Sequence, residues 1–177
     1  MTTATARFAT VHTPPGPFTV VVTTGPDGED VVLASGWTDD VSELLPVVHR
    51  TLRPAWVERA DSLPVLDVVT AYAAGDVTAI DRVPVRQRSG PFLTDAWDVL
   101  RTVPPGQPDT YASFAVRCGR PSAVRAAAGA CARNAAALFV PCHRVLSSGG
   151  GLGGFRWGTP VKRWLLDHEA EHAPVAV

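Results

Sequence analysis

Apolar and polar positions in the first half of the chain follow the short periods of strands and helices. A β-rich run over 18–23 lies between turns rich in proline and glycine, which favours a strand that continues into a hairpin. Apolar residues at helical spacing predict two helices further on, and Gly75 stops the second of them. The expected elements are strands over 18–23, 31–34 and 83–85 and helices over 40–52 and 66–74. This half therefore predicts a small α+β scaffold, and it carries no motif that indicates chemistry.

The second half is mainly helical by the same criterion. A polar segment over 86–91 is the expected linker, which divides the chain into a domain over 1–88 and a domain over 89–177. The expected elements are helices over 92–103, 110–118, 123–133 and 161–168 and a short apolar strand over 138–140. Two of these helices are joined by a turn over 119–121, which is the pattern of a DNA-binding helix-turn-helix. The same pattern also occurs in packed helix pairs that bind no DNA.

The two helices of this pair have recognisable starts and an unusual second member. Asp109 or Thr110 is the candidate N-cap of the first helix, and Ser122 is the candidate N-cap of the second. The second helix, over 123–133, consists almost entirely of small residues, which allows it to lie very close to another surface. Arg125 interrupts this smooth helix with one long cation. Such a side chain can enter a DNA groove and fill the space that an extruded base leaves.

The composition excludes several classes of protein. The chain has 177 residues, 46% of them hydrophobic, so it can bury a core and is not expected to be disordered. No apolar run reaches the roughly 18 residues that cross a bilayer, and the N-terminus lacks the apolar stretch of a signal peptide. Three cysteines, none in a zinc-site spacing, predict free thiols rather than disulfides or a structural zinc. We therefore expect a soluble cytoplasmic protein.

Charge is distributed unevenly along the chain. Residues 1–90 carry 7 basic and 11 acidic side chains, whereas residues 91–177 carry 9 basic and 6 acidic ones. Six arginines and no acidic residue lie within 117–156. A basic local surface of this kind fits a polyanion such as DNA, although a solvated arginine-rich face is also common.

One cysteine stands apart from the other two. Cys118 and Cys131 are expected to be buried as hydrophobic side chains. Cys142 instead follows a proline, precedes His143 and lies in the segment without carboxylates, where positive charge favours the reactive thiolate. A neighbouring imidazole can remove the thiol proton directly or through a water molecule, and it needs a carboxylate that orients it. Asp167 and Glu169 are the candidates.

Two alternatives to this interpretation are a thiol hydrolase, which would use the cysteine, and a purely structural domain, which would not. A thiol hydrolase would also use a cysteine and a histidine, but adjacent residues fit that arrangement poorly. A purely structural domain would leave the arginine-rich, acid-free surroundings of Cys142 unexplained.

After the cysteine in the sequence, a glycine-rich loop over 149–154 can approach a ligand closely, and the aromatic residues Phe155 and Trp157 suit stacking on a flat group.

These motifs together resemble the O6-alkylguanine-DNA alkyltransferase family, the methylated-DNA–protein-cysteine methyltransferases. The resemblance rests on PCHRV at 141–145, Asn134 eight positions before Cys142, the glycine-rich loop and the LLxHE pattern that ends at Glu169. It covers about residues 92–170. The GFRWG stretch at 154–158 is most similar to the C-terminal domain of the bacterial protein Ada. The AYAAG stretch at 71–75 and the TPPGPFTVVV stretch near the start more weakly resemble the N-terminal domain of the family.

The resemblance implies a fold and a reaction. A small ribonuclease-H-like domain would precede a mainly helical, winged-helix domain with a helix-turn-helix, giving an α+β protein. The protein would bind double-stranded DNA that contains O6-alkylguanine and flip the damaged guanine out of the duplex. It would then move the alkyl group irreversibly to its own cysteine, once per molecule. The family needs no metal or organic cofactor, and a monomer without membrane attachment is expected.

The resemblance also assigns roles to individual residues. Cys142 would accept the alkyl group, with His143 as a base that acts through a water molecule, Glu169 as its orienting carboxylate and Asn134 as support. The residues expected to contact DNA are Tyr111, Arg125, Ala126, Ala127, Gly129 and Arg133. Those expected to line the guanine pocket are Cys131, Val145 through its backbone, Gly154, Phe155, Arg156 and Trp157.

The sequence departs from the family pattern at the pocket. Many members have a tyrosine where this chain has Phe155, so assistance to the leaving guanine must come from Tyr111 or a backbone amide. Arg156 and Trp157 replace small residues of some relatives, which predicts a narrower pocket that accepts methyl groups better than benzyl groups. The alternative function is a non-catalytic protein that binds alkylated DNA, as alkyltransferase-like proteins do. Such proteins lack the reactive cysteine, which this chain retains.

Overall fold

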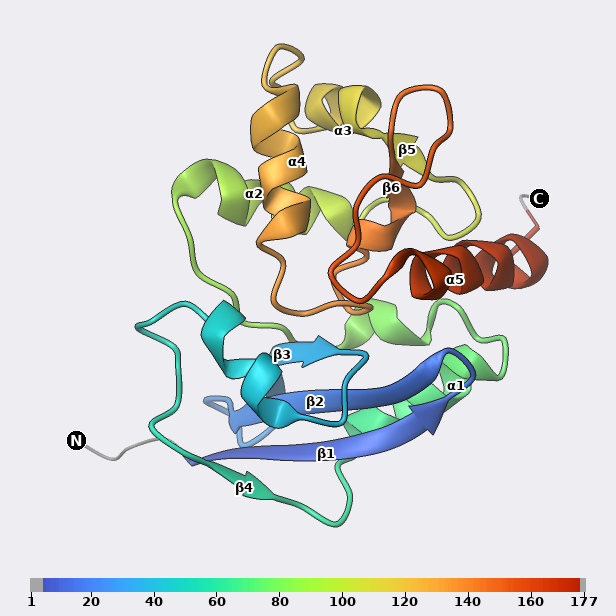
Figure 1. Cartoon of the computed structure of the whole chain (residues 1–177). Coiled ribbons are helices and arrows are strands. Elements are labelled where there is room, and N and C mark those ends of the chain that lie inside the picture. Colours follow the sequence, from blue (N-terminus) through green and yellow to red (C-terminus); the bar gives the residue numbers. More distant parts are fainter. Residues whose placement is uncertain (1–4, 176–177) are drawn as a thin grey trace.

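The first part of the chain forms a twisted four-stranded sheet. The computed structural model describes residues 5–175, and within them the sheet has the strand order β3-β2-β1-β4. The strands are β1 (Ala6–Thr13), β2 (Gly16–Thr24), β3 (Asp30–Gly36) and β4 (Val57–Arg59). Strands β1, β2 and β3 are antiparallel neighbours, whereas β4 runs parallel to β1. Figure 1 shows this sheet at one end of the molecule, with helix α1 (Val65–Ala73) packed beside it.

Several predictions for this half are confirmed and others are wrong. The structure confirms the central hairpin and the helix that ends before Gly75. The predicted helix over 40–52 is instead two single 3₁₀ turns, η1 (Val41–Glu43) and η2 (Leu45–Val47), because Pro46 removes a backbone donor and Val48 is extended. The predicted strand over 83–85 is only one bridge, between Val85 and Val32. Strands β1 and β4 were missed.

The second part is helical, as predicted. It begins with α2 (Pro91–Leu100), continues with α3 (Tyr111–Arg117) and α4 (Val124–Ala132), and ends with α5 (Thr159–His172). Thr110 caps α3 in a reciprocal capping box with Ser113, which settles the choice between the two candidate caps. Ser122 is not a cap, because α4 starts one residue later than predicted and Ala123 occupies the N-cap position.

The predicted strand over 138–140 is wrong. These residues form turns, and Leu138 has a left-handed backbone with φ of 74°. The side chain of Asn134 explains the difference, because it accepts from the backbone N–H of Ala136 (3.1 Å) and donates to the carbonyl of Val140 (2.7 Å). These bonds replace a strand ladder with a compact loop over 134–141, called the turn loop below. The loop leads into η4 (Cys142–Arg144) and then β6 (Val145–Leu146), which pairs with β5 (Asp109–Thr110).

The two parts share one buried core. Its apolar residues come from β1, β2, β3, α1, α2, α3, α4 and α5, and they include Phe18 of the sheet beside Phe139 of the turn loop, with ring centroids 6.2 Å apart. In Figure 1, α3 and α4 lie at the end of the molecule away from the sheet, and the chain between α4 and α5 runs between the two parts. The loop that carries the cysteine is therefore fixed from both sides.

Candidate active site

Cys142 lies at the start of η4, where the turn loop ends. Its side chain is 8% exposed, and the amide nitrogen Nδ2 of Asn134 donates to its sulfur at 3.2 Å. The loop itself is attached to the edge of the sheet, because Ser35 donates its backbone N–H to the carbonyl of Ala135 (2.9 Å) and its hydroxyl to the carbonyl of Ala137 (2.8 Å). The sulfur is thus held at a defined point with one polar partner.

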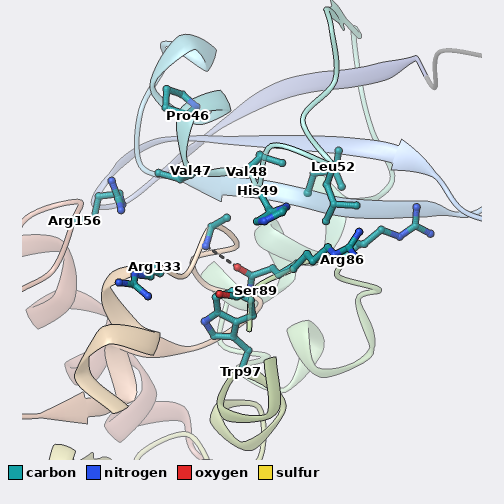
Figure 2. Close-up of a pocket in the computed structure, with 14 residues that line it drawn as sticks. Pro46, Val47, Val48, His49, Leu52, Arg86, Ser89, Trp97, Arg133 and Arg156 are labelled. Atoms are coloured by element: carbon teal, nitrogen blue, oxygen red, sulfur yellow. Dashed lines mark hydrogen bonds between the residues drawn. The ribbon is translucent and has the colours of Figure 1, made fainter. Parts of the chain in front are cut away.

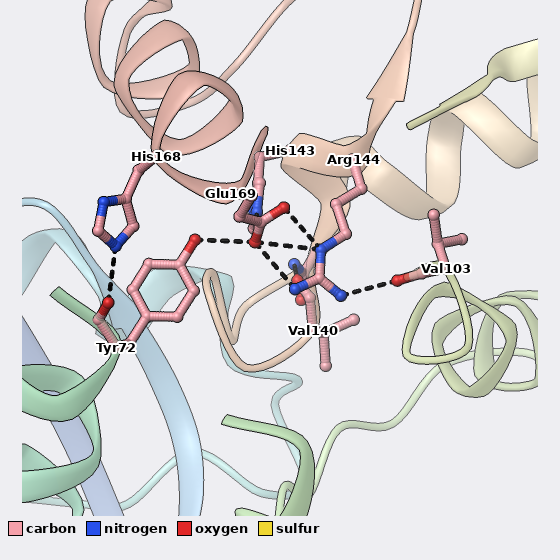
Figure 3. A network of polar contacts seen from close by, with 8 residues as sticks. Tyr72, Val103, Val140, His143, Arg144, His168 and Glu169 are labelled. Atoms are coloured by element: carbon pink, nitrogen blue, oxygen red, sulfur yellow. Dashed lines mark hydrogen bonds and ion pairs between the residues drawn. The ribbon is translucent and has the colours of Figure 1, made fainter. Parts of the chain in front are cut away.

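Behind the cysteine is a buried network of charged and polar side chains, shown in Figure 3. The Nε2 atom of His143 lies 2.8 Å from Oε1 of Glu169, and both side chains are fully buried. Arg144 donates to both oxygens of the same carboxylate at 2.8–3.1 Å and to the carbonyl of Val103 at 2.7 Å. The hydroxyl of Tyr72 donates to Oε1 of Glu169 at 2.8 Å. Glu169, and not the exposed Asp167, is therefore the orienting carboxylate.

This geometry defines the hydrogen positions on the imidazole. A carboxylate only accepts hydrogen bonds, so Nε2 of His143 carries a hydrogen and Nδ1 is the basic nitrogen. Among residues 5–175, Nδ1 of His143 is the one buried side-chain nitrogen or oxygen without a hydrogen-bond partner. Burial lowers the pKa of His143, against the opposing charge of Glu169. The imidazole is accordingly neutral and can take a proton at Nδ1.

The carboxylate that orients the imidazole stays ionised. Burial alone would raise the pKa of Glu169, but the charges and hydrogen bonds of His143 and Arg144 hold it well below its usual value. Burial and the charge of Glu169 raise the pKa of Tyr72, which therefore remains a hydrogen-bond donor. Near neutral pH this buried carboxylate is therefore an acceptor for the imidazole.

The cysteine is a thiol at rest, which changes the expectation from the arginine-rich segment. Burial raises the pKa of Cys142, although the Asn134 hydrogen bond and the charge of Lys162 oppose the rise. The buried Arg144 is paired with Glu169, so its positive charge is neutralised by the carboxylate and does not stabilise a thiolate at Cys142. Lys162 is fully buried and donates to the carbonyl of Val145 at 2.7 Å. The thiol consequently needs a base, and His143 is its sequence neighbour.

A cavity of about 330 Å³ opens in front of the cysteine. Its walls come from α3, α4, the turn loop and the segment before α5, and they include Tyr111, Ala128, Cys131, Ala132, Asn134, Ala137, Cys142, Gly154, Phe155, Arg156 and Trp157. Burial raises the pKa of Cys131, so this second cysteine of the cavity stays protonated. Burial also raises the pKa of Tyr111 and leaves a neutral phenol that can donate. The cavity is the size of a small planar group.

The aromatic wall of the cavity is supported by the sheet. The Trp157 ring lies directly over Gly36 of β3, where an added Cβ atom would clash with it. Phe155 packs against Trp37, with ring centroids 6.1 Å apart. One side of each aromatic ring thus packs against the protein, and only the other side can face a ligand.

The outer face of α4 carries most of the residues predicted to contact DNA. Arg125 and Ala126 are exposed and Gly129 has open space around its Cα. Ala127 is wrong as a DNA contact, because it is fully buried on the inner face of the helix. Arg133, at the end of α4, lines a second cavity of about 300 Å³ at the junction of the two parts. Figure 2 shows Arg133 and Arg156 on one side of this cavity and Arg86 on the other.

Comparisons with known proteins agree with this site. Residues 91–171 match the family described as 6-O-methylguanine DNA methyltransferase, DNA binding domain. The methylated-DNA–protein-cysteine methyltransferase of Shigella flexneri is 32% identical over 162 residues, which cover 90% of this chain and 92% of that protein. This chain belongs to the methylated-DNA–protein-cysteine methyltransferase family. The Escherichia coli protein Ada, a transcriptional activator and DNA repair enzyme, is 44% identical over 90 residues, which are 51% of this chain and 25% of Ada.

Solved structures place the whole chain in the same family. The O6-methylguanine methyltransferase of Mycobacterium tuberculosis is 28% identical and superposes with a TM-score of 0.74, covering 97% of this chain and 96% of the other. The same M. tuberculosis enzyme in complex with DNA gives a TM-score of 0.70 at 29% identity, over 97% and 96% of the two chains. The mixed α+β architecture of this methyltransferase is thus shared over nearly its full length.

The methyltransferase site contains residues that sequence reasoning missed and omits one that it predicted. Val145 does not line the cavity; it is buried, and its carbonyl is bound by Lys162. Lys162, Tyr72 and Gln87 were missed, because each reaches the site from a segment with an ordinary pattern. Only the AYAAG stretch signalled the position of Tyr72, and it did so through the family resemblance.

Neither a metal site nor a membrane-spanning helix was predicted from the sequence. Between residues 5 and 175, no group of three or more histidine, cysteine, aspartate or glutamate side chains is placed to hold a metal ion. In the same range, no helix is long and apolar enough to cross a bilayer.

Proposed function

We propose that this protein repairs O6-alkylguanine in double-stranded DNA by moving the alkyl group to Cys142. The observation that carries the proposal is the arrangement around the sulfur. A buried thiol faces a cavity of the size of a base, and a neutral imidazole with a free basic nitrogen is the next residue. Full-length relatives named for the transfer of methyl groups from DNA to a protein cysteine support the same reaction. A non-catalytic lesion binder is not favoured.

DNA would be bound through the exposed face of α4. This face is smooth and cationic, with Arg125 near its start, and we infer that Arg125 enters the duplex where the damaged nucleotide has left. Ala126 and Gly129 would let the backbone approach the groove, and Tyr111 would crowd the phosphate of the target nucleotide. The flipped guanine would then occupy the cavity between α4 and the Phe155 wall.

The transfer itself is a single displacement. The sulfur of Cys142 attacks the alkyl carbon, so the S–C bond forms as the bond between that carbon and O6 breaks. The thiol proton passes through a water molecule to Nδ1 of His143, and Glu169 stabilises the imidazolium through Nε2–H. The departing guanine receives a proton from a donor at the cavity, and we assign this role to the neutral phenol of Tyr111, which regains a proton as the imidazolium of His143 releases the one taken from the thiol.

The product is expected to remain on the protein. A thioether at Cys142 has no hydrolysis route comparable to that of an ester, so each molecule acts once. Asn134 keeps its amide against the sulfur and holds the loop carbonyl of Val140, which maintains the direction of attack. Cys131 would line the cavity beside Gly154, Phe155, Arg156 and Trp157 without reacting.

Finer features of the fold and of the partner are also inferred. The order β3-β2-β1-β4, with β4 parallel to β1, supports a ribonuclease-H-like N-terminal domain over 1–88. The α3–α4 pair followed by the short β5–β6 pairing supports a winged helix-turn-helix in the domain over 89–177. A cytoplasmic monomer and a preference for small alkyl groups stay predictions.

Intact-mass measurement tests the proposal. Wild-type protein is incubated with duplex DNA that contains one O6-methylguanine, beside a Cys142→Ala variant and a Cys118→Ala variant. We expect wild type and Cys118→Ala to gain the mass of one methylene group, and Cys142→Ala to gain none. Absence of a mass gain in wild type, with the lesion still bound, would establish a lesion-binding protein instead.

A further inference from the structure

Two residues that precede the matched region 91–171 reach the reactive residues from behind. Tyr72 lies on α1, and its hydroxyl donates to the oxygen of Glu169 that also binds His143. Gln87 lies in the segment between the two parts, and its amide bonds to Asn134, which in turn donates to the sulfur of Cys142. The partner of the imidazole, Glu169, and the partner of the sulfur, Asn134, are therefore each bound by one residue from outside the matched region.

We propose that Tyr72 and Gln87 are positioning residues for the transfer reaction, Tyr72 acting on His143 through Glu169 and Gln87 acting on Cys142 through Asn134. The inference rests on the proposed function. It assigns the first part of the chain a role in the reaction, in addition to its role in the core.

Gln87 is held rigidly enough to position its partner. The backbone N–H of Arg86 donates to the carbonyl of Val32 at 2.8 Å, which fixes this segment to β3. The side chain of Gln87 then makes two hydrogen bonds, donating from Nε2 to Oδ1 of Asn134 at 3.0 Å and accepting from the backbone N–H of Ala135 at 2.8 Å. With Oδ1 of Asn134 occupied, its amide hydrogens stay directed at the sulfur and at the loop carbonyl.

Tyr72 acts on the protonation of His143 through the charge of the Glu169 carboxylate. Its buried O–H spreads the negative charge of Oε1, which would otherwise be concentrated on the Nε2–H of His143. The other charged and titratable groups that face this pair are Arg144 from η4, Lys162 and His168 from α5, Asp81 from the 3₁₀ turn η3 (Ala79–Arg82) and Cys142 itself. Removing the hydroxyl leaves all of these in place and strengthens the pull of the carboxylate on the imidazolium. The imidazole then takes up a proton at a higher pH.

The test uses three variants of the full chain, at two positions, with matched controls. Tyr72→Phe is compared with Thr70→Val. The hydroxyl of Thr70 lies on the same helix and donates to the carbonyl of Leu66 within that helix. Gln87→Ala and Gln87→Met are compared with Gln107→Ala, an exposed glutamine of the same chain without a side-chain hydrogen bond among the described residues. Urea unfolding establishes that each variant is folded under the assay conditions.

Two measurements follow, and one of them does not depend on activity. In Tyr72→Phe, the ring NMR signals of His143 should titrate at higher pH than in wild type, and transfer below neutral pH should slow about threefold while the rate at higher pH is retained. Both Gln87 variants should slow transfer about tenfold at every pH.

The outcomes separate this inference from the proposed function. If His143 titrates in Tyr72→Phe as in Thr70→Val, the role of Tyr72 is wrong, whatever the activity. If folded Gln87 variants react as fast as Gln107→Ala, the role of Gln87 is wrong. An inactive wild-type protein whose His143 titration still responds to Tyr72→Phe would overturn the proposed function and leave the positioning of the imidazole supported.

Discussion

The two sides of Cys142 are built on opposite principles. Behind the sulfur, Glu169 collects hydrogen bonds from three side chains in a fully buried network. In front of it, a cavity of about 330 Å³ is lined mostly by apolar groups, and its aromatic wall leans on the sheet. The rear side determines where protons reside, and the front side determines which group can approach. A change on one side should therefore affect rate or stability in a way that a change on the other side does not.

The largest effect is expected from breaking the rear network at its centre. Glu169→Gln leaves the buried guanidinium of Arg144 without its counter-charge, which should lower the free energy of unfolding by about 3–5 kcal/mol. The transfer rate should also fall by about a hundredfold or more, because the imidazolium loses its stabilising carboxylate. Urea unfolding and single-turnover transfer measure the two losses. Glu171→Gln, an exposed change on the same helix, is the control and should alter neither.

A smaller effect is expected where the front wall touches the sheet. In Gly36→Ala, the new methyl group meets the Trp157 ring, so the ring must move and overpacking should cost about 1–3 kcal/mol. The displaced ring should slow transfer without moving the pH dependence, since the rear network is unchanged. Gly90→Ala, where the added Cβ has no neighbour within 4 Å, is the control. A shifted pH profile in Gly36→Ala would show that the two sides are not separate.

Alkyl-group selectivity should be a property of the front alone. Wild type should repair O6-methylguanine faster than O6-benzylguanine in the same duplex, and Trp157→Ala should raise the relative benzyl rate about tenfold by widening the cavity. Competition between the two lesions measures this ratio directly. Trp56→Ala, on an exposed tryptophan, should leave it unchanged. Equal rates for both lesions in wild type would contradict the prediction of a narrow pocket.

The smallest expected effect is a displacement of the pH profile in wild type. Transfer needs His143 neutral, and burial lowers its pKa, so the rate should hold to a lower pH than an ordinary imidazole of pKa about 6.5 would allow. The rate is lost only as pH falls through the lowered value and the imidazole becomes protonated. Rates of transfer to Cys142 across this range provide the measurement. An acid limb at or above the ordinary value would mean that Glu169 outweighs burial.

Sequence patterns predicted the front of the site better than the rear. The helix pair, the cysteine and the Phe155 wall are local features that helical spacing or sequence motifs mark, whereas of the rear network the motifs marked only His143 and Glu169. The strand over 138–140 failed because a side chain, Asn134, took the backbone bonds that apolar spacing assigned to a ladder. Tyr72 and Gln87 could not be predicted as site residues from local patterns, because their partners lie 97 and 47 positions away; the AYAAG stretch marked the position of Tyr72 only through the family resemblance.

These separations have a consequence for how the protein comes to be active. The turn loop meets β3 across 102 positions, at Ser35 and Ala137, and Glu169 meets α1 across 97. Contacts of this length form late in folding, since a long stretch of chain must be ordered before they bring any gain. On the ribosome, α5 emerges after every other element of residues 5–175, so a nascent chain that lacks α5 cannot complete the relay behind the sulfur. During refolding, the ability to accept an alkyl group should thus arise with the final cooperative step, and it can serve as a sensor of complete folding.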